Sequence, residues 1–403
     1  MADTNRPSHI VVLGAGYSGM LAAITAARRL RGPAARRAGA VTLVNPSTRF
    51  TERLRMHQIA TGQQLADFQI PDVLAGTGVE FVQGWATGID PAERRVVVAT
   101  GEGERILPYD RLVYAIGSTA DTITVPGAAE HAFTLDDPEH AGRLAARLAE
   151  IAPTGGTVAV CGGGLTGLEA ATEIAESFPG VRVVMLSRTP PASTMGDKAR
   201  AYVMRALERL GVEVRAGVEI TKVLPGGVEL AGGESLSFDA VLWTTGMRAA
   251  PLAAGAGIAT DEHGRIVVDA TLRSVSHPSI YAIGDAAAVR QAYGVIHGTC
   301  QSGIPMGAHA GASVAGEVRG GRPRPFRFGY LHQPVSLGRS DAVIQFTHPD
   351  DTPRRWFLSG RSAMIYKELV SGSPMTTYKL AKRIPVPAAV LAGKGGRRNR
   401  VQA

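Results

Sequence analysis

The sequence predicts an α/β protein with two nucleotide-binding units of parallel strands and helices, followed by a small α+β module. Two glycine-rich turns carry this prediction, Gly14-Ala15-Gly16-Tyr17-Ser18-Gly19 and Gly162-Gly163-Gly164-Leu165-Thr166-Gly167. Each turn follows a short apolar run and precedes an alanine-rich stretch, which is the order of strand, turn and helix in a βαβ unit. Two such turns indicate that one chain holds two nucleotides at once.

Length and composition agree with this fold class. At 403 residues the chain exceeds what one hydrophobic core usually serves, so we expect two or three domains. Its 49 glycines and 5% aromatic residues suit an α/β enzyme better than a sandwich or a barrel. The only two cysteines, Cys161 and Cys300, are too few for a disulfide framework and wrongly spaced for a metal site. We therefore expect a cytoplasmic protein without a metal, a secretory signal or a membrane-spanning helix.

The expected elements repeat one order, in which short apolar strands flank a helix, as in a buried parallel sheet. They are strands at 10–13, 40–44, 158–160 and 181–186, with helices at 19–30 and 167–177. Later strands end at Gly117 and at Gly246, a third segment covers 279–285, and a Gly/Ala-rich helix follows near 303–318. The charged, proline-rich stretch 320–325 indicates a linker.

These breaks predict three domains, the first of them discontinuous. We expect residues 1–121 and 250–322 to form the first nucleotide-binding domain, and residues 122–249 to form the second. Residues 323–403 would form a C-terminal cap or dimerisation domain with a basic tail.

The two turns predict different nucleotides. In each, the glycines let the backbone approach a pyrophosphate, whose charge then lies at a helix N-terminus. The strand after the first turn ends in Asn45, which can bond a ribose hydroxyl. The strand after the second turn ends in Ser187 and Arg188, where a hydroxyl and a guanidinium suit the 2′-phosphate of NADPH. A solvated loop arginine is the alternative interpretation of Arg188.

With these motifs the chain resembles the FAD-dependent pyridine nucleotide-disulfide oxidoreductase-like family, whose fold is that of glutathione reductase, and most closely its type II NADH:quinone oxidoreductase-like branch. The resemblance covers residues 8 to 370 by motif order. It implies that the first turn binds FAD and the second binds NADPH or NADH. The implied FAD site comprises Gly14, Ala15, Gly16, Tyr17, Ser18, Gly19, Asn45, Arg53, Ala86, Ala115, Gly117, Gly284, Asp285, Gln301 and Ser302. The implied nicotinamide nucleotide site comprises Gly164, Leu165, Thr166, Gly167, Ser187, Arg188, Thr245 and Gly246.

Three further segments carry the resemblance. Ala115-Ile116-Gly117 is similar to the family's turn near the flavin pyrophosphate, and Gly284-Asp285 is similar to the pair that holds the ribityl chain. The stretch 50–62 resembles the segment beside the flavin in the quinone-reductase branch. It contains no redox cysteine pair, so disulfide reductase chemistry is not expected.

Two residues are implied to act in catalysis. A glutamate at the position of Glu169 lies near the nicotinamide and flavin rings in the quinone-reductase branch, although a helix-start acid stabilised by the macrodipole is an equal alternative. Gln301 lies where that branch has a helix pointing at the flavin. For Cys300 we favour a small buried hydrophobic residue over a reactive thiol. For His57 and His297 we favour structural roles over roles as proton donors.

The C-terminal part is expected to supply a cap and surface contacts. Residues 335–346 are similar to a small sheet that caps the flavin and supports dimerisation or quinone entry in relatives, so a homodimer is expected. Seven bases and no acid follow Ser371 (Lys379, Lys382, Arg383, Lys394, Arg397, Arg398 and Arg400). Such a tail could make weak peripheral contact with the inner face of a membrane, or be a solvated terminus. Nucleic acid is not an expected partner, since the bases are not interleaved with aromatic residues.

Taken together, the residues predict an FAD-dependent NAD(P)H oxidoreductase that passes electrons to a quinone or another small diffusible acceptor. Two other enzymes stay open at this point, a reductase of a ferredoxin-like protein and a biosynthetic flavin dehydrogenase. A flavin-bound redox sensor or interaction protein is the non-enzymatic alternative.

Overall fold

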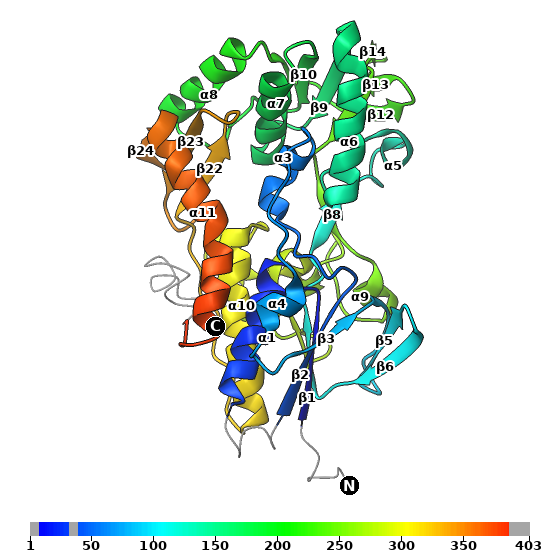
Figure 1. The fold of residues 1–403 in the computed structure, drawn as a ribbon, viewed down its shortest axis with the longest axis vertical. Coiled ribbons are helices and arrows are strands. Elements are labelled where there is room, and N and C mark those ends of the chain that lie inside the picture. The colour runs from blue at the N-terminus through cyan, green and yellow to red at the C-terminus, as the bar shows by residue number, and fades with distance from the viewer. Residues whose placement is uncertain (1–7, 32–38, 387–403) are drawn as a thin grey trace.

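A five-stranded parallel sheet forms the centre of the lower half of the molecule in Figure 1. The computed structural model describes residues 8–31 and 39–386. In spatial order the strands are β18 (Ile280–Ala282), β7 (Arg111–Tyr114), β1 (Ser8–Leu13), β2 (Gly39–Asn45) and β3 (Glu80–Gln83). Because β18 pairs in parallel with β7, the chain returns to this sheet after more than 150 residues.

Two helices pack closely beside this sheet, α1 (Tyr17–Arg29) and α10 (Cys300–Val318). Glycines on α10 permit this approach, because a Cβ at Gly307 would lie 2.2 Å from the Ser18 carbonyl oxygen. A Cβ at Gly311 would lie 2.3 Å from the carbonyl oxygen of Ala22, one helical turn further along. The Gly/Ala-rich composition of this stretch therefore sets the spacing of the two helices.

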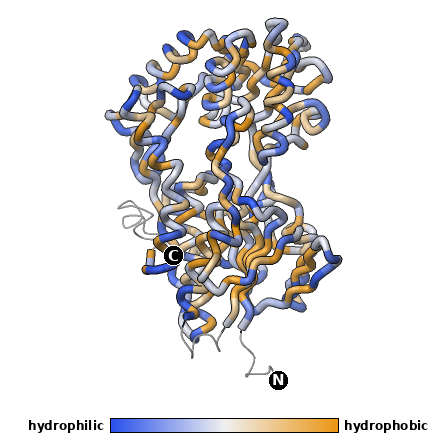
Figure 2. The backbone as a smooth tube through the Cα atoms, viewed as in Figure 1, coloured by the Kyte–Doolittle hydropathy of each residue, from blue (hydrophilic) through white to orange (hydrophobic). Residues whose placement is uncertain are grey.

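A second parallel sheet lies in the upper half. Its order is β11 (Glu213–Ala216), β10 (Arg182–Ser187), β9 (Thr157–Cys161) and β15 (Ala240–Trp243). Around it lie α6 (Pro138–Ile151), α7 (Leu165–Ser177) and α8 (Asp197–Arg209). The central strands of both sheets are largely buried, whereas the edge strands β3 and β11 are mostly not, and Figure 2 shows apolar residues along the lower strands. The predicted α/β class with two Rossmann-like cores is therefore confirmed.

Smaller sheets complete the two halves. One antiparallel sheet contains β4 (Trp85–Asp90), β5 (Arg95–Thr100) and β6 (Gly103–Pro108), and another contains β12 (Ile220–Leu224), β13 (Gly227–Leu230) and β14 (Ser235–Ser237). A short pair, β8 (Ser118–Ala120) with β16 (Met247–Ala249), connects the halves at both crossings of the chain. These crossings lie beside the predicted domain boundaries, which themselves stay a prediction.

The remaining short elements lie between the main ones. They are η1 (Arg53–Arg55), α3 (Met56–Ile59), α4 (Ile70–Leu74), α5 (Ala128–His131), η2 (Ala152–Thr154), α9 (Leu252–Gly255), β17 (Ile266–Val267), η3 (Gly284–Ala286), β19 (Ala287–Ala288), β20 (Arg290–Gln291) and β21 (Gly294–Val295).

The C-terminal elements run from the upper half back to the lower half. An antiparallel sheet of β22 (His332–Ser336), β23 (Ala342–Thr347) and β24 (Pro353–Ser359) leads into α11 (Gly360–Ala381). Near its end the buried Tyr378 hydroxyl donates to the Tyr17 carbonyl oxygen at 3.0 Å, at the first residue of α1. The last helix therefore reaches the first glycine turn (Figure 1).

The expected element bounds need modest correction. Helices predicted from residues 19 and 167 begin at Tyr17 and Leu165, because the third glycine of each turn already has helical backbone. Glu169 consequently lies in the second turn of α7 and not in the first. The helix expected near 303–318 begins at Cys300, where Thr299 caps it through a capping box with Ser302.

Candidate functional site

The first glycine turn has the geometry that a dinucleotide needs. Gly14 has a φ of +91°, and a Cβ there would lie 2.5 Å from the Ala115 carbonyl oxygen. A Cβ at Gly19 would lie 1.9 Å from the Gly14 carbonyl oxygen, so helix and strand meet closely. A Cβ at Gly16, by contrast, meets nothing within 4 Å. Two glycines thus close the turn, and the middle one leaves its outer side open to a pyrophosphate.

The second turn repeats this geometry. Gly162 has a φ of +124°, and a Cβ at Gly167 would lie 2.0 Å from the Gly162 carbonyl oxygen. The middle position, Gly164, again has nothing within 4 Å, and it is the N-cap of α7. Leu165 and Thr166 form the first residues of that helix. Both turns therefore present the N-terminus of a long helix to an open space.

The predicted FAD residues gather around the first turn. The Ala15 amide donates to Asn45 Oδ1 at 2.9 Å, and Asn45 Nδ2 donates to the Ser47 carbonyl oxygen at 2.8 Å. Asn45 therefore first shapes the turn, with one carbonyl lone pair left for a ribose hydroxyl. A Cβ at Gly284 would lie 2.7 Å from Ser18 Oγ, so Gly284-Asp285 lies against the start of α1.

Asp285 is held at this site by its neighbours. The Ser118 hydroxyl donates to Asp285 Oδ2 at 3.3 Å. Arg53 Nη1 donates to the carbonyl oxygen of the same Ser118 and lies beside Gly117. Ala115 is buried next to Gly117, whereas Ala86 is half-buried on β4 and packs against the core of the lower half. Of the predicted FAD residues, those of the first turn thus lie beside Ala115, Gly117, Gly284 and Asp285 at the carboxyl ends of β1 and β7. Gln301 and Ser302 lie at the start of α10, and Ala86 lies on β4.

A large pocket runs from the second turn to the N-terminus of α10. Its volume is about 1650 Å³. The predicted residues that line it are Gly164, Leu165, Thr166, Glu169, Ser187, Arg188, Thr245, Gly246 and Gln301. At the far end Leu54, Ile304, Pro305, Val370 and Pro374 give it an apolar wall between α10 and α11. One continuous space thus connects the nucleotide end to an apolar end.

Ser187 and Arg188 differ in what they can offer a nucleotide. The buried Ser187 hydroxyl donates to the Thr189 carbonyl oxygen at 2.7 Å, so its proton is used within the loop. The Arg188 side chain is exposed and lines the pocket. Among residues 8–31 and 39–386, no hydrogen bond or ion pair engages its guanidinium. Of the predicted pair, only Arg188 has free donors for a phosphate.

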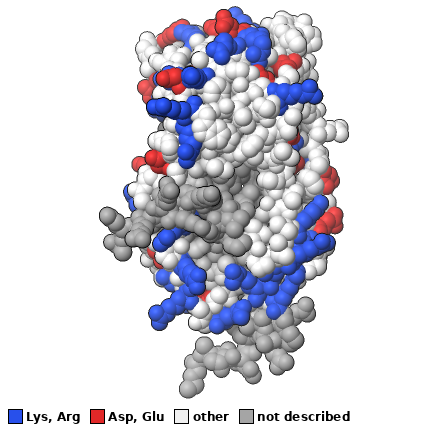
Figure 3. Space-filling model, turned by 90° about the vertical axis from the view of Figure 1, so that its left-hand side faces the viewer, with Lys and Arg blue, Asp and Glu red and all other residues white. Residues whose placement is uncertain are grey.

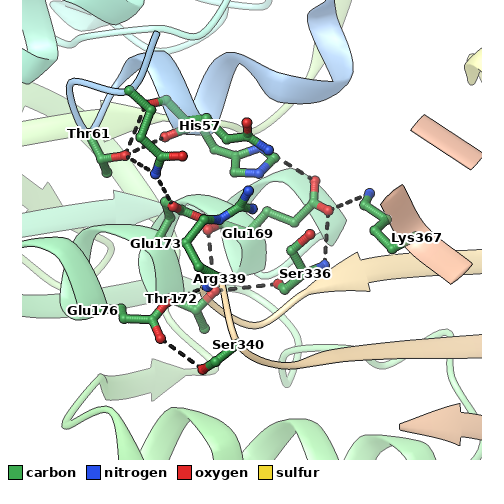
Figure 4. A network of polar contacts seen from close by, with 12 residues as sticks. His57, Thr61, Glu169, Thr172, Glu173, Glu176, Ser336, Arg339, Ser340 and Lys367 are labelled. Carbon is green, nitrogen blue, oxygen red and sulfur yellow. Dashed lines mark hydrogen bonds and ion pairs between the residues drawn. The ribbon is translucent and has the colours of Figure 1, made fainter. Parts of the chain in front are cut away.

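Glu169 lies in a buried ion pair at the pocket wall (Figure 4). Lys367 Nζ lies 2.6 Å from Glu169 Oε1, and the Ser336 amide donates to the same oxygen at 3.1 Å. Burial alone would raise the pKa of Glu169, but Lys367 and the bond from Ser336 outweigh it and hold this pKa below its usual value. Glu169 is therefore an ionised carboxylate with specific partners, and its role is not limited to an interaction with the macrodipole of α7.

A second polar group continues along the same face of α7 (Figure 4). Arg339 Nε lies 2.9 Å from Glu173 Oε2, and the Arg339 amide donates to Glu176. Ser340 Oγ donates to Glu176 at 3.0 Å. The turn between β22 and β23 is thereby fixed to α7, which keeps Ser336 in place against Glu169.

The start of α10 is more fully bonded than the sequence predicted. Gln301 Nε2 donates to the His332 carbonyl oxygen at 3.0 Å, and its Oε1 accepts from the Leu331 amide at 2.6 Å. The Gln301 side chain therefore fixes the start of β22. Ser302 belongs to the capping box, and burial raises the pKa of the Cys300 thiol to about 11. Cys300 thus stays protonated, in agreement with a hydrophobic interpretation.

The two histidines considered from the sequence have different surroundings. His57 is buried, its Nδ1 lies 3.8 Å from Glu169 Oε2, and burial lowers its pKa to about 4. His297 is half-exposed on the pocket wall, where its Nε2 lies 3.3 Å from Asp351 Oδ2 and its ring stacks on Tyr330. Among the residues that the structure describes, no group of three or more His, Cys, Asp or Glu is arranged to hold a metal ion.

Comparison with known proteins decides the family. The model of the pyridine nucleotide-disulphide oxidoreductase family matches residues 8–313. An NADH dehydrogenase-like protein from Mycobacterium tuberculosis is 35% identical over 83% of this chain and 87% of its own length. The chain belongs to the pyridine nucleotide-disulphide oxidoreductase family. It is therefore an oxidoreductase, as the sequence motifs predicted.

Two more distantly similar proteins each cover more than four fifths of the chain. The type II NADH:quinone oxidoreductase of Staphylococcus haemolyticus is 25% identical over 83% of this chain and 88% of its own. The solved structure of NDH2 from Plasmodium falciparum in complex with NADH has a TM-score of 0.76 at 15% identity, covering 95% of this chain and all of the other. The latter similarity supports the fold.

Two residues of the candidate site were not predicted from the sequence. Lys367 and Arg339 both lie in the C-terminal part, more than 160 residues from the acids that they contact. Arg339 lies within the segment 335–346, but no role was assigned to it, and a lysine such as Lys367 inside a helix is usually a solvated residue. The only available signal was indirect, since the buried α7 acids Glu169 and Glu173 required cationic partners from elsewhere in the chain.

Proposed function

We propose that the chain is an FAD-dependent NAD(P)H oxidoreductase that passes electrons to a quinone or a similar small, planar acceptor. The single observation that supports this most strongly is the continuous pocket of about 1650 Å³. It holds a glycine turn for a nucleotide at one end and an apolar wall at the other, with the N-terminus of α10 between them. A nucleotide and an acceptor can thus approach the same region.

The residues present fit FAD at the first turn. The open side of Gly16 would admit a pyrophosphate, Asn45 has a free lone pair for a ribose, and Asp285, held by Ser118, would accept from the ribityl hydroxyls. Bound FAD would supply the two-electron chemistry between nicotinamide and acceptor. The capped N-terminus of α10 presents backbone amides that favour negative charge at its end.

At the second turn, the nicotinamide nucleotide would lie along the pocket wall. The amides at Leu165 and Thr166 would donate to its pyrophosphate, and the Arg188 guanidinium would donate to the 2′-phosphate of NADPH. Thr245 and Gly246 line the stretch between these amides and α10. The chain's own contribution here is orientation and the exclusion of water.

The Glu169–Lys367 pair gives the acceptor end a proton donor. Lys367 lines the pocket, and its Nζ lies 2.6 Å from Glu169 Oε1. This ion pair fixes the position of the ammonium group. An acceptor oxygen that gains electrons becomes basic and can take this proton. Lys367 would then be a neutral amine beside the Glu169 carboxylate, and this negative charge favours the return of a proton to Lys367 from solvent in the pocket. His57, whose burial lowers its pKa to about 4, is neutral at pH 7 and is a packing neighbour of this pair.

The domain division follows the same proposal. Residues 1–121 and 250–322 would bind FAD, residues 122–249 would bind NAD(P)H, and residues 323–403 would form a cap that also supports a homodimer. Size-exclusion chromatography with light scattering of the full chain tests the dimer. A mass of one chain, against the 42.1 kDa of the sequence, would contradict it.

A peripheral contact with the inner face of a membrane, in an otherwise cytoplasmic protein, is the proposed role of the basic C-terminus. Lys382 lies near Lys379, Arg31 and Arg383, since burial and then these three neighbouring cations lower the pKa of Lys382. Figure 3 shows basic side chains gathered near the lower end of the molecule. Lys394, Arg397, Arg398 and Arg400 lie outside the described residues. No helix within 8–31 and 39–386 has the length and apolar character to cross a bilayer.

An acceptor screen tests the proposed reaction. Purified holoprotein would be assayed with NADH and NADPH against a small quinone, a ferredoxin, ferricyanide and oxygen. Rapid reduction of the quinone is the expected result. Turnover that depends on added ferredoxin, or no turnover with any acceptor, would contradict the proposal and favour a protein-partner reductase or a redox sensor.

A further inference from the structure

The nucleotide end of the pocket carries two opposite charges on neighbouring strand ends. Strand β10 ends at Ser187 and is followed by Arg188, and the Val218 amide donates to the Ser187 carbonyl oxygen at 3.1 Å. This bond places Glu219 beside the end of β10. Arg188 and Glu219 both line the pocket, and both are exposed.

Both charges are available to a ligand. Within the described ranges 8–31 and 39–386, neither side chain has a hydrogen bond to another side chain or an ion pair within 4.0 Å. Two nearby arginines, by contrast, are paired, since Arg215 lies 3.0 Å from Glu234 and Arg248 on the pocket wall lies 3.2 Å from Asp121. Two free charges of opposite sign therefore face the part of the pocket beside the second turn.

Apolar side chains beside these two charges suit one particular part of a nucleotide. Val218 and Ile220, which flank Glu219, also line the pocket and offer a surface for an adenine ring. The adjoining ribose would then lie between Arg188 and Glu219. A guanidinium favours a 2′-phosphate, whereas a carboxylate accepts a hydrogen bond from a 2′-hydroxyl and repels a phosphate.

We infer that Glu219 is a specificity residue that opposes Arg188, so that the site uses NADH and NADPH with similar efficiency. The inference rests on the proposed NAD(P)H oxidoreductase function and refines it. Ser187 adds little to phosphate binding, because its hydroxyl proton is donated to Thr189. The preference for NADPH expected from Ser187 and Arg188 alone is thereby reduced by a residue 31 positions after Arg188.

The test compares kcat/KM for NADH and NADPH in the holoprotein. We expect the two values to differ by less than about tenfold in the wild type. Glu219→Gln should raise the NADPH/NADH ratio about tenfold, and Arg188→Gln should lower it about tenfold. The matched controls are Glu213→Gln and Arg182→Gln, exposed residues of β11 and β10 that do not line the pocket.

A binding measurement gives a second readout that needs no turnover. Adenosine 2′,5′-bisphosphate should inhibit Glu219→Gln about tenfold more tightly than the wild type, whereas adenosine 5′-diphosphate should inhibit both proteins alike. Unchanged ratios in Glu219→Gln and Glu219→Ala, with an unchanged bisphosphate inhibition constant, would overturn the inference while leaving the oxidoreductase proposal intact. A wild type that oxidises neither nucleotide would instead overturn the proposed function.

Discussion

Replacement of Lys367 by methionine tests the buried ion pair. Lys367 Nζ lies 2.6 Å from Glu169 Oε1, and the two side chains are only 8% and 11% exposed. Methionine keeps the length of the side chain but removes the ammonium, which leaves Glu169 with the Ser336 amide as its nearest hydrogen-bond donor. Breaking a buried pair from one side costs about 3–5 kcal/mol, because an uncompensated charge stays in a poorly solvated place.

The pH dependence of this loss has a definite sign. In the wild type the pKa of Glu169 is lowered, so its contribution to stability is present above pH 4.5 and is lost as the pH falls. Without Lys367 the effect of burial dominates and the pKa of Glu169 rises above 4.5, its usual value. The folded variant then binds a proton more strongly than the unfolded chain, so its deficit grows as the pH rises through this pKa. Lys367→Met should be about 3 kcal/mol less stable than the wild type at pH 8, and less affected at pH 5.

Urea unfolding of the holoprotein at both pH values measures this effect. The double variant Glu169→Gln/Lys367→Met should recover most of the loss, because two neutral groups leave no buried charge. Lys379→Met, on the exposed side of the same helix, is the control and should change the free energy of unfolding by less than about 0.5 kcal/mol. A Lys367→Met protein as stable as this control at pH 8, or single losses that simply add in the double variant, would refute the reasoning.

Three other predictions follow from the same geometry. Burial lowers the pKa of His57 and of His332 from 6.5 to about 4. Because the unfolded chain binds protons at these histidines at a higher pH than the folded protein does, stability should fall as the pH drops from 6.5 to 4. The urea midpoint of a His57→Gln/His332→Gln variant should fall less steeply over this range. Gly16→Val should fold but retain no flavin, as measured by absorbance after gel filtration, whereas Gly101→Val, also in open space, should retain it. Gln301→Ala removes two bonds to the start of β22 and should raise KM for the acceptor about tenfold, while the rate of flavin reduction by NADH in stopped-flow stays unchanged.

The fold was predictable because its main signals are local. Each glycine turn needs only about six consecutive residues to specify strand, turn and helix, and two copies in one chain predict two Rossmann-like cores. The clashes that a Cβ would make at Gly14, Gly19 and Gly167 explain why glycine stands there. Helix starts were placed two residues late because the third glycine was taken as the boundary of the helix.

The candidate site was only partly predictable, because its decisive contacts join distant segments. The ion pair of Glu169 needs Lys367 from the last helix, and no periodicity in the sequence relates the two residues. Gln301 was expected to face the cofactor, but both ends of its amide bond the backbone of residues 331 and 332. Ser187 was expected at a phosphate, yet its hydroxyl closes a local turn with Thr189. Residue type predicted chemistry in each case, whereas tertiary partners determined how much of it is available.

The central claim is that one pocket brings a nicotinamide nucleotide and an electron acceptor to the same flavin. An anaerobic titration of the FAD-loaded protein with NADH tests this claim most directly. The account predicts stoichiometric loss of the oxidised flavin absorbance, followed by its full return when one equivalent of a small quinone is added. A protein that takes up no FAD, or a bound flavin that neither NADH nor NADPH reduces, would contradict the account.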